Sequence, residues 1–427
     1  MNKMFAALRV RNYRLFAAGS LISGVGTWMQ RVAQDWLVLT LTGSAGALGI
    51  TTGLQFLPIL LFSPIAGVLA DRLPKRSVLM VTQVAMAATA IVLGLLAVTG
   101  AVTTWHVYVL AFVFGTGAAF DMPARQAFVN EIVGKAKLAN AVALNSAAFH
   151  LARMIGPAIA GGIIALLGSG VDATGWVILV NGATYFAVLL QLKRIRTEEL
   201  TQAPLVPRAK GQLRAGVAYV RSRPDIMLVM GVVFCAGTFG LNFQMTTALM
   251  ATDVYDKGAG EYGVLGSIVA VGSLVGALIA ARRTTSRQRL VVVGGIIFGV
   301  VTMIAGLMPS YLTFALFLPV CGLAALTLIT SANAFVQMAV EPSMRGRVMA
   351  LYMAVFMGGT PFGAPLLGWV ADHAGARWTL IGGGALTALG TVVAVLLSAR
   401  SQGLVITRYI RSPWRRHDIE MGPVVTD

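Results

Sequence analysis

Charged residues are scarce in this chain. Aspartate, glutamate, lysine and arginine make up 11% of its 427 residues, whereas hydrophobic residues make up 57%. A soluble domain keeps roughly 25% charged residues to cover its surface, so the composition excludes an ordinary soluble protein. Cysteines are also few. Cys235 and Cys321 both lie in apolar segments, which indicates packing residues and no disulfide framework.

Residues that build common enzyme sites are equally sparse. The chain has no phosphate-binding Gly-x-x-x-x-Gly-Lys-Ser/Thr loop, and its lone Gly-x-Gly-x-x-Gly match at 258–263 falls in a predicted outer loop with no strand before it. The four histidines are too scattered for a metal site or a catalytic triad: His106, His150, His373 and His417. We therefore predict a protein that is not an enzyme and that holds no metal or cofactor.

Long apolar runs dominate the chain instead. Each spans about 20 to 28 residues, enough to cross a hydrocarbon core of about 30 Å. Each must be helical, because lipid offers no partners for backbone polar groups. We expect an all-α membrane protein with twelve transmembrane helices, at residues 14–39, 47–70, 77–99, 105–130, 139–167, 174–192, 226–250, 262–281, 289–308, 311–339, 347–371 and 376–398.

Basic residues are distributed unevenly along these helices. All but five of the 33 lysines and arginines fall at the N-terminus, in loops after even-numbered helices or in the C-terminal tail. This bias predicts a multi-pass protein of the cell membrane with both termini in the cytoplasm. Tryptophans at the predicted outer helix ends agree with that orientation: Trp36, Trp105, Trp176, Trp369 and Trp378. The net charge of +17 therefore reflects topology and does not indicate nucleic-acid binding.

One long polar interruption divides the chain. It covers residues 193–225, and its part from Gly211 to Arg221 is typical of an amphipathic helix on the inner membrane face. We predict four parts: an N-terminal six-helix bundle (1–192), a cytoplasmic linker (193–225), a C-terminal six-helix bundle (226–398) and a basic cytoplasmic tail (399–427).

The two predicted bundles resemble each other. Residues 127–168 align without gaps on residues 334–375, and the identical pairs include Phe149/Phe356, Gly156/Gly363 and Gly161/Gly368. Membrane composition raises the number of chance identities, but glycines and phenylalanines that match at one offset favour a duplication. Two pseudo-symmetric six-helix repeats are a transporter architecture, in which the site lies at mid-membrane between the halves.

The loop after the second helix carries a motif. Residues 67–76 read GVLADRLPKR, which resembles the cytoplasmic signature of the major facilitator superfamily, Gly-x-Leu-Ala-Asp-Arg-x-Gly-Arg-Lys. Pro74 replaces the usual glycine, and the equivalent second-half segment from Gly276 lacks the aspartate. A carboxylate here can tie the halves together through nearby arginines and a helix N-terminus. The resemblance implies a gating motif of Gly67, Asp71, Arg72, Lys75 and Arg76, with Glu131 as the expected partner of Arg76; the alternative is a purely topogenic basic loop.

The fifth helix carries a second motif. Residues 152–162 read ARMIGPAIAGG, which resembles the antiporter motif of drug-exporting branches at Gly156, Pro157, Gly161 and Gly162, with Ala152 in place of the first glycine. The alternative is a generic small-residue packing face. The chain as a whole is similar to the bacterial branch that holds macrolide and enterobactin exporters. This resemblance implies export and does not identify the substrate. We predict a monomeric, proton-coupled exporter of amphiphilic small molecules; the alternatives are a narrow-specificity siderophore or metabolite exporter and a non-transporting receptor or scaffold.

Charged residues in the cores of the predicted helices all fall in the first half, since those of the second-half helices lie only at helix ends. A charge at the membrane centre costs about 2.5 to 3.5 kcal/mol, so such residues are expected to be paired or to face a cavity. Asp35 and Asp121 are the candidate proton-coupling carboxylates, and we rank Asp35 first because it lies in the outer half, whereas Asp121 can pair with Arg125 on the same helix. Arg153, near the membrane centre, would tune an acid or bind an anionic ligand; alternatively, it only holds helices together.

A cavity between the halves would draw on both bundles. In the first half, polar residues line one side of the first helix and a short stretch of the fifth. In the second half, aromatic and methionine side chains can repack around varied amphiphiles, although for any single one of them a core or lipid-facing role is the favoured alternative. The predicted cavity residues are Arg31, Gln34, Asn145, His150, Arg153, Phe243, Tyr352 and Phe356.

Overall fold

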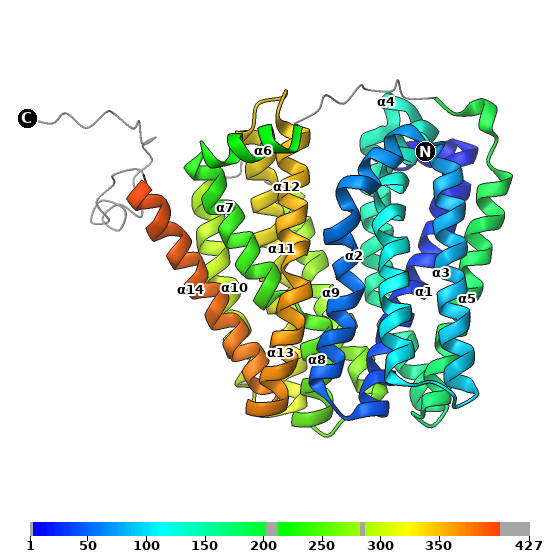
Figure 1. The fold of residues 1–427 in the computed structure, drawn as a ribbon, viewed down its shortest axis with the longest axis vertical. Helices are drawn as coiled ribbons and strands as arrows, with labels where there is room; N and C mark the ends of the chain where they lie inside the picture. Colours follow the sequence, from blue (N-terminus) through cyan, green and yellow to red (C-terminus); the bar gives the residue numbers. More distant parts are fainter. Residues whose placement is uncertain (1–2, 202–211, 282–286, 402–427) are drawn as a thin grey trace, which may run out of the picture.

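The computed structural model describes residues 3–201, 212–281 and 287–401, and nearly all of them are helical (Figure 1). The first half holds α1 (Arg11–Thr42), α2 (Ala45–Arg72), α3 (Lys75–Val98), α4 (Thr104–Leu166) and α5 (Val171–Arg194). The second half holds α7 (Pro224–Cys235), α8 (Phe243–Leu249), α9 (Ala259–Ala281), α10 (Gln288–Gly306), α11 (Tyr311–Ala339), α12 (Arg345–Gly358), α13 (Thr360–Ala374) and α14 (Arg377–Ser401). Between the halves lies α6 (Gln212–Arg221), and the short elements are η1 (Lys3–Arg9), η2 (Thr197–Glu199), η3 (Ala236–Gly240) and η4 (Met250–Val254).

Eleven segments of the described ranges are long and apolar enough to cross a membrane. Two of them come from α4, whose helical backbone is broken at Gly134, where φ is +67°. The elements from α7 to η4 form one span over Pro224–Val254, and α12 and α13 form another over Arg345–Ala374. The more polar α1 packs against α4 and α5 as the twelfth long helix. The predicted all-α, twelve-helix architecture in two bundles is thereby confirmed.

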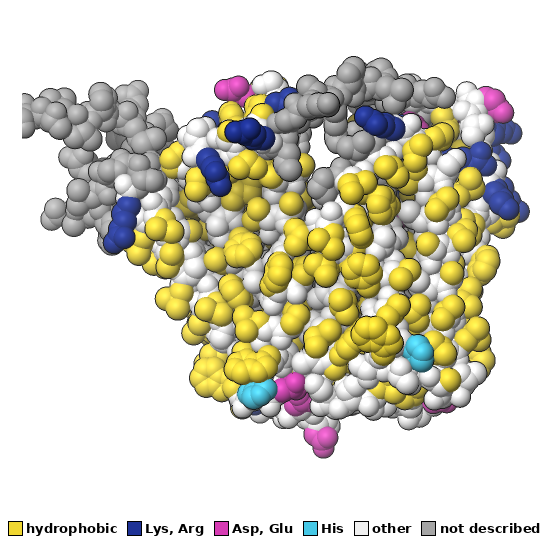
Figure 2. Space-filling model, in the orientation of Figure 1, with side chains coloured by type: hydrophobic (Ala, Val, Ile, Leu, Met, Phe, Trp, Pro, Cys, Tyr) yellow, Lys and Arg dark blue, Asp and Glu magenta, His cyan; other side chains and the backbone are white. Residues whose placement is uncertain are grey.

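The two ends of the molecule differ. We call the end that holds α6 and the N-terminus the linker side, and the opposite end, where α1 turns into α2, the far side (Figure 1). Between them, hydrophobic side chains cover the flank seen in Figure 2, and exposed lysines and arginines lie mainly toward the linker side. Trp105, Trp176, Trp369 and Trp378 are all more than half exposed at far-side helix ends, as expected for an interfacial belt.

The halves meet along two helix pairs, α2 with α13 and α4 with α9. A Cβ atom on Gly161 would lie 2.5 Å from the carbonyl oxygen of Ala259, and one on Gly368 would lie 2.5 Å from that of Ala45. Only glycine permits backbones to approach this closely. Gly161 and Gly368 are equivalent positions in the duplication, so the two halves make matching contacts at α4 with α9 and at α13 with α2. We call these two contacts the far-side seams.

The same helix face that forms a seam becomes exposed toward the linker side. Positions 161, 157, 154, 150, 147 and 143 follow one face of α4. At its far end, the carbonyl oxygen of Pro157 and the backbone of Gly161 pack against Gly263 of α9, whereas Ala147 and Ala143 are exposed. The halves are therefore closed on the far side and separated on the linker side. The linker residues 202–211 and the predicted tail from residue 402 lie outside the described residues.

Candidate functional site

A break in the seventh span positions the first part of the site. Between α7 and α8 the chain passes through the π-turn of η3, and Leu241 leaves the helical conformation. The Asn242 side chain stabilises the break by donating to the carbonyl oxygen of Thr238 (2.8 Å). Irregular helices of this kind are common where transporters bind their substrates. The break is followed directly by Phe243, whose ring packs on Phe298, and by Gln244, whose side chain reaches the other half.

A pocket of about 40 Å³ lies between the halves at these residues. The first half contributes Trp28, Val32, Arg153 and Pro157; the second half contributes Phe243, Gln244, Thr247, Tyr262, Gly266 and Val269. Pro157 and Gly266 also belong to the seam between α4 and α9, so the pocket lies directly beside that seam. Of the predicted cavity residues, Arg153 and Phe243 line it.

Asp35 joins the two halves beside this pocket. Its side chain is only 5% exposed, and its Oδ2 atom accepts hydrogen bonds from Gln244 Nε2 (2.6 Å) and from the Tyr262 hydroxyl (2.7 Å). Both donors come from the second half, whereas Asp35 is on α1. Sequence reasoning missed Tyr262, because it placed the start of the eighth helix at that residue, whereas α9 begins earlier, at Ala259.

Two arginines share one aromatic ring next to the pocket. The guanidinium carbon of Arg31 lies 4.9 Å from the centre of the Trp28 ring, and that of Arg153 lies 5.5 Å from it. Gly156 permits this arrangement, since a Cβ atom there would lie 2.6 Å from the Cβ atom of Trp28. Within the described residues, neither arginine forms a salt bridge. Arg31 Nε and the neighbouring His150 Nδ1 are buried without a hydrogen-bond partner.

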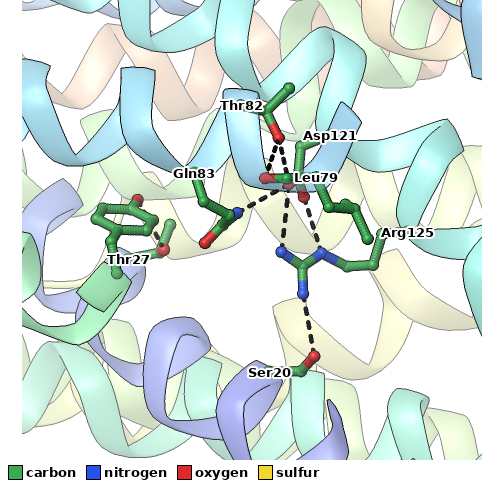
Figure 3. A network of polar contacts seen from close by, with 8 residues as sticks. Ser20, Thr27, Leu79, Thr82, Gln83, Asp121 and Arg125 are labelled. Carbon is green, nitrogen blue, oxygen red and sulfur yellow. Dashed lines mark hydrogen bonds and ion pairs between the residues drawn. The ribbon is translucent and has the colours of Figure 1, made fainter. Parts of the chain in front are cut away.

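Asp121, the other candidate carboxylate, is enclosed in a polar network of the first half (Figure 3). Arg125 Nε lies 2.8 Å from Asp121 Oδ2 in a salt bridge one helical turn apart. Thr82 and Gln83 donate to Asp121 Oδ1 at 2.9 and 2.8 Å, and Arg125 Nη1 donates to the Ser20 hydroxyl (3.0 Å). This network joins α1, α3 and α4. Its carboxylate is neutralised locally, in contrast to Asp35.

The remaining predicted cavity residues do not line this pocket. Tyr352 is 1% exposed and stacks on Phe356 within the second half, with ring centres 6.3 Å apart. Asn145 accepts a hydrogen bond from the Tyr13 hydroxyl (3.0 Å), which ties α4 to α1. Gln34 is 2% exposed on α1. The structure thus brings Arg31 and Arg153 of the predicted cavity together at one ring. It leaves Tyr352 and Phe356 packed on each other within the second half.

The motif after α2 has a different pairing from the expected one. Glu131 forms a salt bridge with Lys75 (3.1 Å), whereas Arg76 donates to the carbonyl oxygens of Leu192 (2.7 Å) and Lys193 (3.2 Å). The expected pair of Glu131 with Arg76 is therefore wrong. The reason is helical geometry: adjacent residues point about 100° apart, so Lys75 faces α4 and Arg76 faces α5. Arg72 is exposed, and the side chain of Asp71 lies outside the described part, so the latch role of the motif stays a prediction.

A second carboxylate bridges the halves on the far side. Asp372, near the end of α13, accepts hydrogen bonds from the backbone nitrogens of Ala45 (2.8 Å) and Gly46 (2.9 Å) and from the Ser44 hydroxyl (3.0 Å). It thereby satisfies free backbone donors at the start of α2. Sequence reasoning missed this contact. The only available signal was the Ser44 cap at the start of the second helix.

The motif at residues 152–162, predicted on the fifth helix, lies in the second part of α4. Its residues make several different contacts. Gly156 packs on α1, Gly161 packs on α9, and Pro157 lies inside the helix and lines the pocket. A Cβ atom on Gly162 would have no neighbouring heavy atom within 4 Å, so this glycine makes no comparable contact. In this structure, the motif holds α4 against both halves at once.

The chain is similar in sequence to known membrane transporters. A family described as transmembrane secretion effector matches residues 2–413. The multidrug efflux pump Tap of Mycolicibacterium fortuitum is 29% identical over 394 residues, which cover 90% of this chain and 94% of that protein. Macrolide efflux protein A of Streptococcus pyogenes is 24% identical over 395 residues, with 91% and 96% covered. The staphyloferrin A transporter of Staphylococcus aureus is 22% identical over 362 residues, with 84% and 89% covered.

Solved structures share the fold. A bacterial homologue of the human lysosomal transporter Spinster, in an inward-facing and occupied conformation, superposes with a TM-score of 0.72 at 16% identity, covering 92% of this chain and 97% of that one. A D-xylose-proton symporter superposes with a TM-score of 0.69 at 13% identity, covering 89% and 96%. Two six-helix bundles, a pocket between them and a family match over nearly the whole length lead to one conclusion: the chain is a membrane transporter of the transmembrane secretion effector family, within the major facilitator superfamily, and not an enzyme.

Proposed function

We propose that this transporter exports amphiphilic small molecules across the bacterial cytoplasmic membrane by alternating access, driven by proton influx. The names of the relatives support export, since two of those compared above are efflux proteins. The distribution of basic residues supports a cytoplasmic linker side with both termini inside. In that orientation, the structure is open to the cytoplasm and closed to the outside, the state in which an exporter loads its substrate. One chain supplies both walls of the pocket, so we propose that it acts as a monomer.

The observation that carries the proposal is the position of Asp35. Its two hydrogen bonds to Gln244 and Tyr262 cross between the halves beside the far-side seam. Opening the outer side must break these bonds, and an ionised carboxylate makes them roughly twice as strong as neutral ones. In the empty transporter, the ionised Asp35 therefore holds the outer side closed.

Substrate and proton would release this tie in different ways. Gln244 and Tyr262 both line the pocket, so a bound substrate can compete with Asp35 for them and permit outward opening. In the outward-open state, the Asp35 carboxylate has lost these donors and must shed water before it is buried again. A proton that neutralises Asp35 lowers this desolvation cost and lets the carboxyl group return to its buried position without substrate. Only a loaded or a protonated transporter then crosses between the two states, which is the requirement for exchange. Asp121 is less suited to this role, because Arg125 already pairs with it.

A second candidate function is export of one siderophore or metabolite. The relative named as a staphyloferrin A transporter favours it, as do the two arginines that lack a salt bridge at the pocket. The number of chemically different compounds that the protein transports distinguishes the two candidate functions.

Transport by the purified full-length chain in proteoliposomes tests the proposal. We expect counterflow of at least one compound from a panel of macrolides, dyes and organic acids, and uptake or release driven by a pH gradient. Asp35→Asn should abolish gradient-driven transport but retain substrate binding. If no compound shows counterflow, the chain is a receptor or scaffold of this fold. If Asp35→Asn still couples proton flux to substrate flux, the coupling site is not Asp35.

A further inference from the structure

Two partly buried arginines beside the pocket have no salt-bridge partner among the described residues. Arg31 and Arg153 both contact the Trp28 ring, and within the described residues neither has a carboxylate within salt-bridge distance. The nearby Asp35 uses its Oδ2 atom for Gln244 and Tyr262 instead. A buried charge without a partner is costly, and a transporter tolerates it when a ligand completes the site.

The contrast with the other buried arginine of the same half is informative. Arg125 has a paired carboxylate and a hydroxyl acceptor. Arg31 has an Nε atom that is buried and lacks any acceptor, and its charge adds to the positive potential at Arg153. The first half thus pairs Arg125 directly with a carboxylate, whereas it places none within salt-bridge distance of Arg31 or Arg153.

We propose that the pocket binds the acid group of an amphiphilic organic carboxylate, at Arg153 and within the positive potential that Arg31 adds. This inference rests on the proposed export function and names its class of substrate. A guanidinium matches the two oxygens of a carboxylate in a planar, bidentate geometry. Gln244 and Tyr262 supply further donors on the opposite wall once they leave Asp35.

The size and surroundings of the pocket fit an acid group with an apolar body attached. A volume of about 40 Å³ holds a carboxylate but not a whole drug-sized molecule. The body of the ligand must then extend toward the open linker side. Phe243 flanks the pocket, and Phe149, which is 54% exposed, lies one turn of α4 toward the linker side from Arg153. Beside Phe149, the His150 Nδ1 atom has no hydrogen-bond partner in the protein and offers one more polar contact.

Binding of three matched probes to the full-length protein in lipid nanodiscs tests this inference. The probes are radiolabelled 2-naphthoate, its neutral analogue 2-naphthamide and the cation 2-naphthylmethylammonium, measured by equilibrium dialysis. We expect 2-naphthoate to bind at least about tenfold more tightly than either analogue, a difference of about 1.4 kcal/mol. Arg153→Met should remove that preference, and Arg153→Lys should restore part of it, because an ammonium keeps the charge but lacks the planar fork.

Arg377→Met is the matched control. Arg377 also lies over an aromatic ring, with its guanidinium carbon 5.6 Å from the centre of Tyr255, but it is on the far side and does not line the pocket. Its loss should leave the preference for 2-naphthoate unchanged. Equal binding of 2-naphthoate and 2-naphthamide, or full preference in Arg153→Met, would overturn the inference.

The test separates this inference from the proposed function. If cationic or neutral compounds show counterflow in proteoliposomes while 2-naphthoate does not bind selectively, export stands and the substrate class is wrong. If 2-naphthoate binds as expected while no compound, including 2-naphthoate, shows counterflow, the anion site stands and export is wrong.

Discussion

The carboxylate of Asp372 lies 2.8 Å from the backbone nitrogen of Ala45, although the two residues belong to opposite halves of the molecule. Together with its bonds to Gly46 and Ser44, this contact fixes the start of α2 to the end of α13. It exists only while the far side is closed. Asp372 therefore stabilises the closed far side directly.

We expect Asp372→Ala to shift the transporter toward its outward-open state. Loss of a capping side chain at a helix N-terminus costs about 0.5 to 2 kcal/mol, which changes the ratio of the two states by about 2- to 30-fold. A reporter cysteine at Thr247, in a background without Cys235 and Cys321, should then react faster with an impermeant maleimide added outside. The control is Asp256→Ala, which changes an exposed carboxylate on the same side. Equal labelling rates in the two variants would contradict this role of Asp372.

Gly161, at a far-side seam, should not tolerate a larger side chain. Gly161→Leu places a side chain 2.5 Å from the carbonyl oxygen of Ala259, and backbone cannot yield as a side chain tip can. We expect transport to fall to background and the Thr247 reporter to become accessible from outside. Gly162→Leu is the control, since nothing lies within 4 Å of a Cβ atom there. Normal transport by Gly161→Leu would show that the seam is not needed for closure.

The salt bridge between Asp121 and Arg125 should be structural. Asp121→Ala leaves a buried guanidinium without its charge partner, which typically costs about 3 to 5 kcal/mol. We expect a lower thermal unfolding temperature in detergent. The double variant Asp121→Ala/Arg125→Leu should recover most of that loss, because it removes both charges. If the single variant unfolds at the wild-type temperature, the network contributes little to stability.

The orientation of the chain has a direct test. Glu198, on the linker side, and Lys257, on the far side, are both exposed. Single cysteines at these positions, in the cysteine-free background, should differ in intact cells: Lys257→Cys should react with impermeant maleimide and Glu198→Cys should not. After the cells are permeabilised, both should react. The reverse pattern in intact cells would show that the chain has the opposite orientation, and the proposed direction of transport would then be wrong.

The sequence was sufficient for features that depend on neighbouring residues. Helix spans follow from local hydropathy, and the pair of Asp121 with Arg125 follows from their spacing of one helical turn. The identical pair Gly161 and Gly368 of the duplication was also visible in the sequence, and both glycines form seam contacts. Each of these signals lies within a single helix or within a fixed offset between repeats.

Contacts between the halves could not be predicted in the same way. The partners of Asp35 and Asp372 lie far away in the sequence, and they meet only because the far-side seams are closed in this state. The pairing of Glu131 failed for a smaller reason, since a shift of one residue along α3 exchanges Lys75 for Arg76. Hydropathy does not fix helix rotation to within one residue.

The uneven distribution of buried charge also determines how the membrane potential acts on this protein. Among the described residues, the charged groups deep in the helices are Arg31, Arg125, Arg153, Asp35 and Asp121. Their net charge is +1, and all of them belong to the first half. A potential of 100 mV acts on one elementary charge with about 2.3 kcal/mol. A bound monoanion would cancel that charge, so the loaded transporter could change state without electrical work, whereas the empty one could not.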